Sequence, residues 1–350
     1  MRILAIDVGM GTQDILLYDS NKNIENCFKM VLPSQTQIIA KRISRETNLQ
    51  KDIVLVGETM GGGPCAAAVR RHIEANLSVY ATEQAALTLN DSIDKIREMG
   101  VIIVGDDEVK ELDASRIVMC DIDKQGLKKA LALFGVPIPD KFAIAVQDHG
   151  YSPGMSNRIF RFDYFRNIIQ KGGDLNSFAY KDNIPHRFTR MKAVERTLPG
   201  ALLMDTGIAA IRGALLDNNA KLPCIAINIG NGHTLAGIIV NGKIIALFEH
   251  HTHQMTSGKL DDYLERLCDG TIGYMEVYED GGHGCYVGRS IGFNNVGSIL
   301  VTGPRRDIMH GSHLDFQFAV PHGDMMLTGC FGLIEGYFHY IEEKKMRPAK

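Results

Sequence analysis

The chain has 350 residues, of which 45% are apolar and 23% are charged, and its formal net charge is −3. This length predicts two lobes rather than one core, and the charge gives no reason to expect a nucleic-acid partner. No apolar run reaches the ~20 residues that a membrane span needs, and the N-terminus shows no signal peptide, so we expect no membrane partner.

Seven cysteines are scattered along the chain without a CxxC pair. An odd, scattered set of this kind predicts reduced thiols, so we expect a cytoplasmic protein. The same spacing argues against a locally encoded iron–sulfur cluster.

The first predicted element is a β-hairpin over residues 4–19, in which two apolar runs flank Gly9-Met10-Gly11. Residues 225–240 repeat this pattern around Gly230-Asn231-Gly232. Glycines at such tips supply a positive φ or allow close backbone approach, and their exposed N–H groups can bind phosphate oxygens. Two such hairpins predict a duplicated fold that closes around a phosphate.

The first half of the chain is predicted to alternate strands with helices. Strands are expected at 52–57, 101–104, 117–121 and 142–146, and helices at 35–48 and 65–75. Residues 151–198 are polar and aromatic with few apolar runs, which indicates an irregular insertion. A glycine-containing helix over 200–216 then leads to the second hairpin, so we expect an N-terminal lobe at 1–198 and a C-terminal lobe at 199–350.

The C-terminal lobe has the clearer pattern. Strands at 225–229, 235–240 and 243–249 form a meander with an Asn241-Gly242 turn. A helix at 259–268 and strands at 298–302 and 316–320 follow. The closing helix at 325–340 contains three glycines, and since glycine costs about 1 kcal/mol inside a helix, they predict close helix packing.

This order of hairpin, linking helix, hairpin, strand with glycine turn and closing helix resembles the actin-like ATPase superfamily, which includes acetate and sugar kinases, Hsp70 chaperones and actin. The resemblance implies an α/β, two-lobed actin-like fold, a duplicated ribonuclease H-like unit that binds ATP and Mg²⁺ in a central cleft. Residues 4–19 and 225–240 resemble its two phosphate motifs, and 299–304 its adenosine motif. Asn228 stands where aspartate is usual, and Pro304 where a second glycine is common.

Within that superfamily the chain is similar to a family whose label relates it to pyruvate formate-lyase activating enzymes. Such activators are radical enzymes that need a CxxxCxxC loop, and this sequence has none. The cysteine pattern therefore does not support the label.

The resemblance places nucleotide contacts at Gly9, Gly11, Thr12, Asn228, Gly230, Gly232, His233, Gly303 and Arg305. Asp7 ends the first strand beside a phosphate turn, where a carboxylate is suited to hold hydrated Mg²⁺. Glu58 and Asp148 follow strands expected to be parallel neighbours of the first one, so both are candidate catalytic bases, together with His149 as a base or metal ligand. Their alternative role is the capping of turns.

A histidine-rich stretch ends the third strand of the second meander. If the strand stays extended, Glu249, His251 and His253 point to one face and His250 to the other. Two imidazoles and a carboxylate match a facial triad for Zn²⁺ or another transition metal; the alternative is a solvated polar loop. His283 lies in a glycine-rich segment, which is either a flexible ligand-covering loop or a plain surface loop.

Three functions stay open from the sequence. The leading prediction is a Mg²⁺-dependent ATP phosphotransferase or hydrolase that acts on a small molecule. The alternative is a nucleotide-driven switch that activates a partner enzyme and has no small-molecule substrate. A third is a degenerate pair of lobes that has lost nucleotide binding and retains metal chemistry only. The basic and aromatic run at 158–166 is too short for a nucleic-acid patch.

Overall fold

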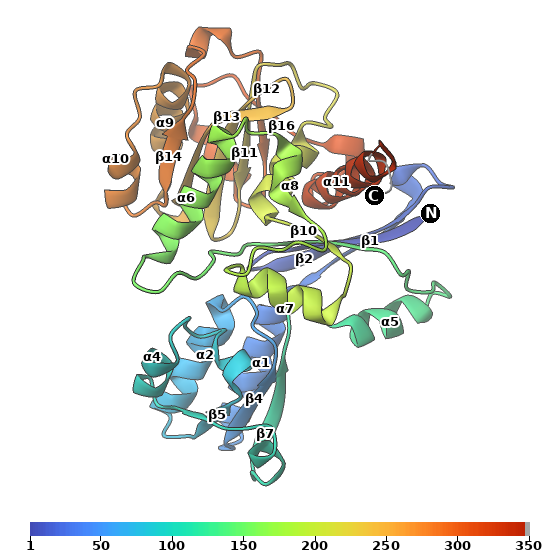
Figure 1. The fold of residues 1–350 in the computed structure, drawn as a ribbon, viewed down its shortest axis with the longest axis vertical. Helices are drawn as coiled ribbons and strands as arrows, with labels where there is room; N and C mark the ends of the chain where they lie inside the picture. Colours follow the sequence, from blue (N-terminus) through green and yellow to red (C-terminus); the bar gives the residue numbers. More distant parts are fainter. Residues whose placement is uncertain (347–350) are drawn as a thin grey trace.

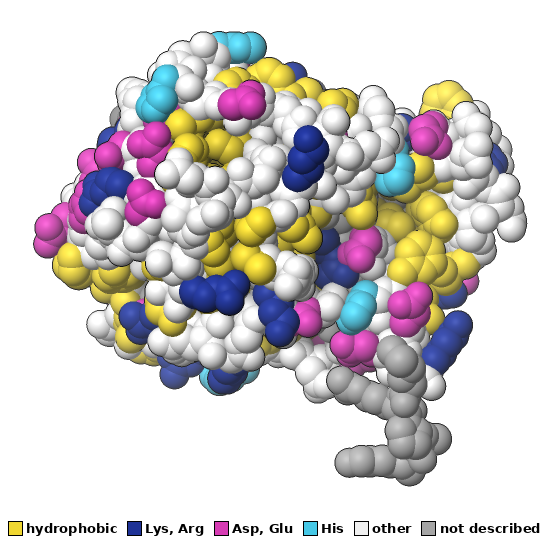
Figure 2. All heavy atoms as spheres, turned by 90° about the horizontal axis from the view of Figure 1, so that it is seen from above, with side chains coloured by type: hydrophobic (Ala, Val, Ile, Leu, Met, Phe, Trp, Pro, Cys, Tyr) yellow, Lys and Arg dark blue, Asp and Glu magenta, His cyan; other side chains and the backbone are white. Residues whose placement is uncertain are grey.

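The computed structural model describes residues 1–346, which form two six-stranded sheets and one four-stranded sheet with helices between and around them (Figure 1). In this part of the chain, no helix has both the length and the apolar character needed to cross a membrane. On the face seen in Figure 2, acidic and basic side chains are interspersed, which fits the small net charge of −3.

The first sheet contains the N-terminal hairpin and has the strand order β3-β2-β1-β8-β10-β9. β1 pairs antiparallel with β2 and parallel with β8, and β8 pairs parallel with β10. β1 is central, and its four residues from Ile3 to Ile6 are buried on both faces. The strands span Arg2–Val8 (β1), Thr12–Asp19 (β2), Phe28–Pro33 (β3), Phe142–Val146 (β8), Ala179–Tyr180 (β9) and Leu202–Met204 (β10).

The second sheet repeats this arrangement, with the order β14-β13-β12-β11-β15-β16. β11, β12 and β13 form an antiparallel meander, and β15 and β16 run parallel on the far side of β11. The predicted turn has positive φ at both Asn241 and Gly242. The strands span Cys224–Ile229 (β11), His233–Val240 (β12), Lys243–His251 (β13), Gly284–Val287 (β14), Ser298–Thr302 (β15) and Gln317–Phe318 (β16).

Both sheets therefore have three antiparallel strands in the order third, second, first, followed by two strands parallel to the first. A repeated sheet of this order is the duplicated, two-lobed arrangement of the actin-like fold. The fold class predicted from the sequence is confirmed by this topology. Helices α9 (Ser257–Asp269) and α10 (Tyr274–Glu279) cover the outer face of the second sheet.

The third sheet is all parallel, has the order β6-β5-β4-β7 and forms a separate layer with α1, α2, α3 and α4. The prediction that β4 lies beside β1 was wrong. β4 is buried on both faces and needs a partner at each edge, which β5 and β7 supply, whereas both edges of β1 are taken by β2 and β8. The elements span Gln35–Asn48 (α1), Ile53–Gly57 (β4), Gly63–Glu74 (α2), Val79–Ala81 (β5), Glu83–Ala86 (α3), Ile93–Glu98 (α4), Val101–Ile103 (β6) and Ser115–Met119 (β7).

Two connecting segments differ from their predicted form. Residues 151–198, expected to be irregular, contain α6 (Asn157–Gln170) and α7 (Thr189–Thr197), and α5 (Lys124–Ala132) precedes them. The segment expected to be one helix over 200–216 is split into β10 and α8 (Thr206–Ala214). The split arises at Asp205, whose carboxylate caps α8 by accepting from the N–H groups of Gly207 and Ile208.

Helices α8 and α11 (Thr328–Met346) lie side by side between the first and second sheets (Figure 1). One apolar core joins residues of both sheets to both helices. The helices touch backbone to backbone, since a Cβ at Gly213 would overlap the carbonyl of Thr328 and one at Gly332 would overlap the carbonyl of Ala209. The close packing predicted from the glycines of the closing helix is confirmed.

Replacing Gly332 with alanine should destabilise the protein by about 1–3 kcal/mol, because the added methyl group must push α8 and α11 apart. Urea denaturation at equilibrium measures the change. Gly258→Ala in α9 is the matched control, because a Cβ there meets nothing within 4 Å, so the better helix former should leave stability unchanged or slightly higher. Equal denaturation midpoints for the Gly332 variant and the wild type would contradict the packing described.

Candidate functional site

The tips of the two glycine hairpins meet. A Cβ at Gly11 would lie 2.7 Å from Nδ2 of Asn231, and a Cβ at Gly232 would lie 3.8 Å from the Met10 side chain. Residues of both turns line one cleft, together with residues at the ends of β1, β8 and β11. Two turns that lie far apart in sequence therefore form a single site between the sheets.

Both turns close in the same way. The N–H of Gly9 donates to the carbonyl of Thr12, and that of Gly230 to the carbonyl of His233, each at 2.9 Å. The N–H groups of Gly11, Asn231 and Gly232 donate to nothing within residues 1–346. None of the four turn glycines has positive φ, so the requirement for glycine here is close approach rather than left-handed backbone.

Asp7 lies beneath these turns and faces Asp14 across the β1–β2 pair. Burial, followed by the Asp14 charge, raises the pKa of Asp7 to about 8, although a hydrogen bond from Thr206 Oγ1 at 2.5 Å opposes this shift. Burial likewise raises the pKa of Asp14 to about 7, and its Oδ1 has no partner in the described part. A Cβ at Gly329 would overlap the Asp7 carboxylate, so the start of α11 packs directly on it.

In the described residues, the carboxylates of Asp7 and Asp14 lie close together without a cation partner, and one oxygen of Asp14 has no partner. This pair fits a Mg²⁺ site, because that ion binds carboxylate oxygens. The sequence pointed to Asp7 and missed Asp14. The signal for Asp14 was its place in the hairpin register opposite Asp7. Thr12 also lines the cleft, where it hydrogen-bonds Asp14.

The segment that resembles the adenosine motif packs against the end of β11. Gly303 has φ +102°, and a Cβ there would overlap the carbonyl of Ile229. Asn228 and Pro304 line the cleft. The Arg305 side chain is exposed and is not among the cleft-lining residues, although its backbone N–H donates to Ile229.

The two candidate bases both have other partners. Glu58 accepts from Arg196, with Oε2 2.5 Å from Nη2, and does not line the cleft. Asp148 accepts from the backbone N–H groups of Gly150 and Met191, both at 2.8 Å. Burial raises the pKa of Asp148 to about 6 against the lowering effect of these bonds. Asp148 thus makes backbone contacts of the kind that the capping alternative predicts, whereas the partner of Glu58 is a side chain.

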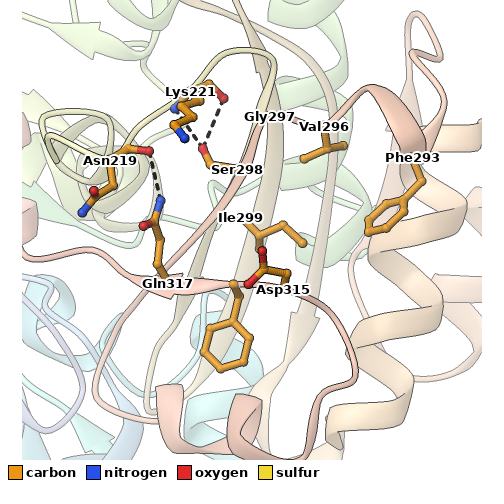
Figure 3. Close-up of a pocket in the computed structure, with 10 residues that line it drawn as sticks. Asn219, Lys221, Phe293, Val296, Gly297, Ser298, Ile299, Asp315 and Gln317 are labelled. Atoms are coloured by element: carbon orange, nitrogen blue, oxygen red, sulfur yellow. Dashed lines mark hydrogen bonds between the residues drawn. The ribbon is translucent and has the colours of Figure 1, made fainter.

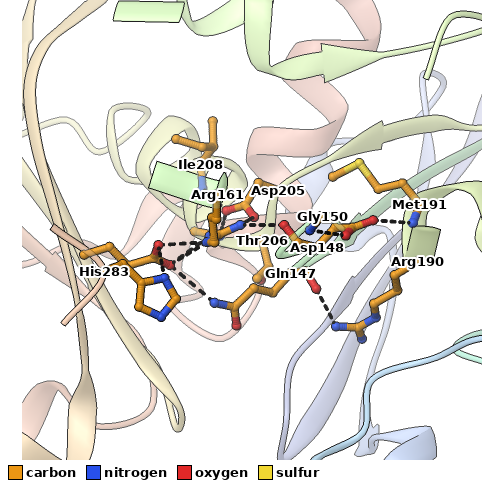
Figure 4. Close-up of polar contacts among 12 residues, drawn as sticks. Gln147, Asp148, Gly150, Arg161, Arg190, Met191, Asp205, Thr206, Ile208 and His283 are labelled. Carbon is orange, nitrogen blue, oxygen red and sulfur yellow. Dashed lines mark hydrogen bonds and ion pairs between the residues drawn. The ribbon is translucent and has the colours of Figure 1, made fainter. Parts of the chain in front are cut away.

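A buried arginine links the two halves of the site (Figure 4). Arg161 of α6 lies 2.8 Å from Glu249 on β13 and 2.6 Å from Asp205, and it also donates to the carbonyl of Asp148 at 3.0 Å. Burial alone would raise the pKa of Glu249, but the charge of Arg161 and the hydrogen bonds that it donates hold this pKa well below its usual value. The predicted metal ligand Glu249 therefore has a cationic partner within the protein.

Three histidines from different elements converge beside this ion pair. His149, His233 and His283 place one ring nitrogen each within 4.8 Å of one another. The His251 ring lies 4.7 Å from that of His233 and 5.1 Å from that of His283, whereas His253 is exposed. His250 points to the other face, as predicted, with its Nε2 3.0 Å from Asp280.

Burial sets the charge of this cluster. It lowers the pKa of His149 well below the usual value, that of His233 to about 3 and that of His251 to about 4. These three rings are consequently neutral at physiological pH, the form in which imidazole binds metals. The sequence grouped His251 and His253 as metal ligands and pointed to His149 and His283 only singly, and the structure shows that His149, His233 and His283 come together through the fold.

A second cavity of about 420 Å³ adjoins the cleft. Its lining includes His149, His233, Asp148, Arg190 and the glycine loop 61–63 that precedes α2. Gly9, Met10, Thr206 and Gly232 line both spaces, so the cleft and this cavity are continuous.

A third cavity, of about 320 Å³, lies apart from this site (Figure 3). It is lined by Ser298 at the start of β15 and by Lys221, whose N–H donates to Ser298 Oγ at 3.0 Å. The glycine turn follows the other end of β15, so this cavity is separated from the hairpin tips by the length of the strand.

Comparison with solved structures finds proteins that align with nearly the whole chain but have low sequence identity and low structural similarity to it. The activator of the 2-hydroxyisocaproyl-CoA dehydratase from Clostridium difficile with bound ADPNP is 8% identical, with coverage of 100% of this chain and 99% of that chain and a TM-score of 0.31. A putative sugar kinase from Cytophaga hutchinsonii is 11% identical, with coverage of 96% and 100% and a TM-score of 0.31. At these values, the fold assignment depends on the strand order described above.

Among curated proteins, Protein FAM3C of Xenopus tropicalis is 26% identical over 153 residues, which amount to 40% of this chain. The chain spans about 64% of the length of that relative. This partial similarity assigns neither a family nor an activity.

A family model extends over much more of the chain. The model described as "Putative pyruvate format-lyase activating enzyme (DUF1786)" matches residues 60–308. This range covers more than two thirds of the sequence, including α6, the second hairpin, the histidine cluster and the Gly303 turn. The chain belongs to the DUF1786 family.

Proposed function

We propose that the protein binds ATP with Mg²⁺ in the cleft between its two glycine hairpins and cleaves or transfers the terminal phosphate. The observation that carries this proposal is the contact between the tips at Gly11 and Asn231, which joins two phosphate-type turns in one cleft. Unpaired backbone N–H groups in such turns bind phosphate oxygens, and those of Gly11, Asn231 and Gly232 have no other partner in residues 1–346.

In this proposal, Asp7 and Asp14 hold Mg²⁺ directly or through its water shell. The ion neutralises phosphate charge, which is its usual contribution to phosphoryl transfer. Thr206 fixes the Asp7 carboxylate by its hydrogen bond, and Gly329 leaves room for it against α11. Asn228 and Thr12 line the same cleft and supply neutral polar contacts.

A small-molecule acceptor fits the cavity of about 420 Å³ that adjoins the cleft. This space is lined by both polar and apolar side chains, and through Gly9 and Gly232 it reaches the turns proposed to hold the phosphates. We place this activity in the cytoplasm, where the seven free cysteines would stay reduced. The described part contains no group of three cysteines that could hold a cluster, so no radical activation step is proposed despite the family description.

One observation favours the switch as a second candidate. Glu58 is paired with Arg196, and Asp148 accepts two backbone hydrogen bonds, so neither predicted base is free to activate an acceptor. A site that binds nucleotide but lacks a free base hydrolyses it slowly, and this suits a protein that changes shape to act on a partner enzyme. Phosphate release with and without candidate acceptors distinguishes the two.

Calorimetric titration of metal-stripped protein with ATP, with and without Mg²⁺, tests the proposal. We expect Mg²⁺-dependent binding that weakens at least about tenfold, or 1.4 kcal/mol, in Gly230→Ala, because a Cβ there lies 2.9 Å from the carbonyl of His233 and must open the turn. Gly258→Ala should bind as the wild type does, because Gly258 does not line the cleft and a Cβ there meets nothing within 4 Å. Absence of binding under both conditions would overturn the proposal and favour lobes that have lost their nucleotide site.

A further inference from the structure

Three imidazole rings lie close together beside the cavity of about 420 Å³ that adjoins the cleft. His149 follows β8 of the first sheet, His233 begins β12, and His283 immediately precedes β14 of the second. One ring nitrogen from each lies within 4.8 Å of the other two. The residues are separated by tens of positions in sequence, so their convergence is a property of the tertiary fold.

The ring nitrogens lack protein partners. His283 is fully buried, and its Nε2 has no hydrogen-bond partner in the described part. The same is true of Nε2 of His233, which lines both the cleft and the cavity. A buried imidazole nitrogen without a partner costs free energy, and the unpartnered nitrogens of His233 and His283 leave that cost uncompensated unless the two rings share a ligand.

A carboxylate behind the rings is positioned to orient one of them. Nδ1 of His283 lies 3.0 Å from Oε2 of Glu249, within ion-pair distance but outside hydrogen-bond geometry. A proton on Nδ1, next to the carboxylate, would leave the lone pair of the imidazole on Nε2. Glu249 is itself fixed by Arg161 at 2.8 Å and by Gln147 at 3.3 Å. A carboxylate that orients a histidine in this way is the usual support for a metal-binding imidazole.

From this geometry we infer that His149, His233 and His283 form a binding site for a divalent transition metal of the Zn²⁺ class. Three imidazole ligands suit Zn²⁺ and leave a fourth position for water or a ligand oxygen. A tetrahedral Zn²⁺ with bonds of about 2.1 Å holds its ligand nitrogens roughly 3.4 Å apart, so rings within 4.8 Å need to move by about an ångström. His233 and His149 also line the cavity, so the fourth position opens toward it.

This assignment replaces Glu249 as a ligand and makes it a positioning residue. It also separates His253 from the site, since that side chain is exposed and is not one of the three histidines whose ring nitrogens converge. His251 lies against His233 and His283 but is outside the group of three whose ring nitrogens lie within 4.8 Å of one another. The site requires neither ATP nor Mg²⁺, so it stands whether or not the nucleotide proposal holds.

Metal-stripped full-length protein titrated with Co²⁺ and Zn²⁺ tests the inference. We expect one Zn²⁺ per chain after gel filtration, by elemental analysis, and an intense visible Co²⁺ spectrum typical of four-coordinate nitrogen ligation. His149→Ala and His233→Ala should each lower Zn²⁺ affinity at least about tenfold, whereas His253→Ala is the matched control and should retain the metal. If His283→Ala fails to fold, the first two variants decide the question.

Two results would overturn the inference. The first is a wild-type protein that retains no Zn²⁺ beyond the level of the His149→Ala/His233→Ala double variant. The second is loss of the metal in His253→Ala with retention in His149→Ala, which would place the site at the end of β13 instead. Glu249→Gln provides a further check on the positioning role, because it should shift the Co²⁺ spectrum and weaken binding while stoichiometry remains one per chain.

Discussion

Asp7→Asn is expected to weaken Mg²⁺-dependent ATP binding on the order of 100-fold and at the same time to raise the melting temperature of the metal-free protein. The two effects have one cause. Asp7 and Asp14 face each other across β1 and β2 with no cation between them, so their charges are costly until Mg²⁺ binds. Removing about 1 kcal/mol of this cost corresponds to roughly 1–2 °C in the melting temperature of a chain of this length.

The pH dependence of stability predicts independently that the Asp7–Asp14 pair destabilises the metal-free protein. The pKa values of Asp7 and Asp14 are raised to about 8 and about 7 in the folded protein, above 3.8 for the free side chain. The folded state thus binds more protons than the unfolded state between these values, so their contribution to stability is lost as the pH rises from about 4 to 8. Metal-free wild type should lose stability relative to Asp7→Asn across this range.

Calorimetry with MgATP and differential scanning fluorimetry without metal measure the two halves of this prediction. Asp19→Asn is the matched control, because Asp19 is on the same hairpin but at its far end, where it pairs with Arg2. It should bind MgATP normally. A destabilised Asp7→Asn protein, or one with unchanged affinity, would contradict the assignment of Asp7 and Asp14 as a metal-binding pair.

Arg161→Met is expected to destabilise the protein by about 3–5 kcal/mol, because it leaves two buried carboxylates without their counter-charge. The Arg161 side chain is 3% exposed, and its partners Asp205 and Glu249 are 6% and 1% exposed. These contacts connect α6 to both the cap of α8 and the end of β13. Chemical denaturation, followed by circular dichroism, measures the loss.

Arg166→Met on the same helix provides the control. Arg166 pairs with Asp163 at 2.8 Å, but its side chain is 39% exposed, so its loss should cost no more than about 1 kcal/mol. In the Arg161→Met background, Glu249→Gln should cost less than it does alone, since the unpaired charge is then removed. Additive effects of the two substitutions would show that the ion pair does not couple these elements.

Local patterns were sufficient for the hairpins and for one of the two carboxylates between them. Apolar runs around Gly-x-Gly turns are complete within residues 4–19 and 225–240, and Asp7 has a fixed place in that pattern. The repeated unit then led to the correct fold class. The strands that pair with β4 could not be inferred in this way, because strand pairing is non-local. Nothing in the sequence of β4 indicates which of two parallel sheets it joins.

The burial of Arg161 and the grouping of the three histidines could not be predicted, for a related reason. Arg161 lies in a basic and aromatic run that resembles a solvated helix face, and only the packing of α6 against the second sheet shows that it is buried. His149, His233 and His283 belong to three separate segments, each with one histidine of the cluster. The conspicuous run at the end of β13 drew attention to His253, which the fold leaves exposed.

The backbone contact between α8 and α11 has a mechanical consequence. Most helix pairs interlock because the side-chain ridges of one fill the grooves of the other. At Gly213 and Gly332 no side chain separates the two backbones, and Arg212 of α8 pairs with Glu335 of α11 across the same interface, so a displacement of one helix presses directly on the other. α8 leads toward the second sheet and α11 packs on β1, so the helix pair connects the two walls of the cleft as one stiff unit.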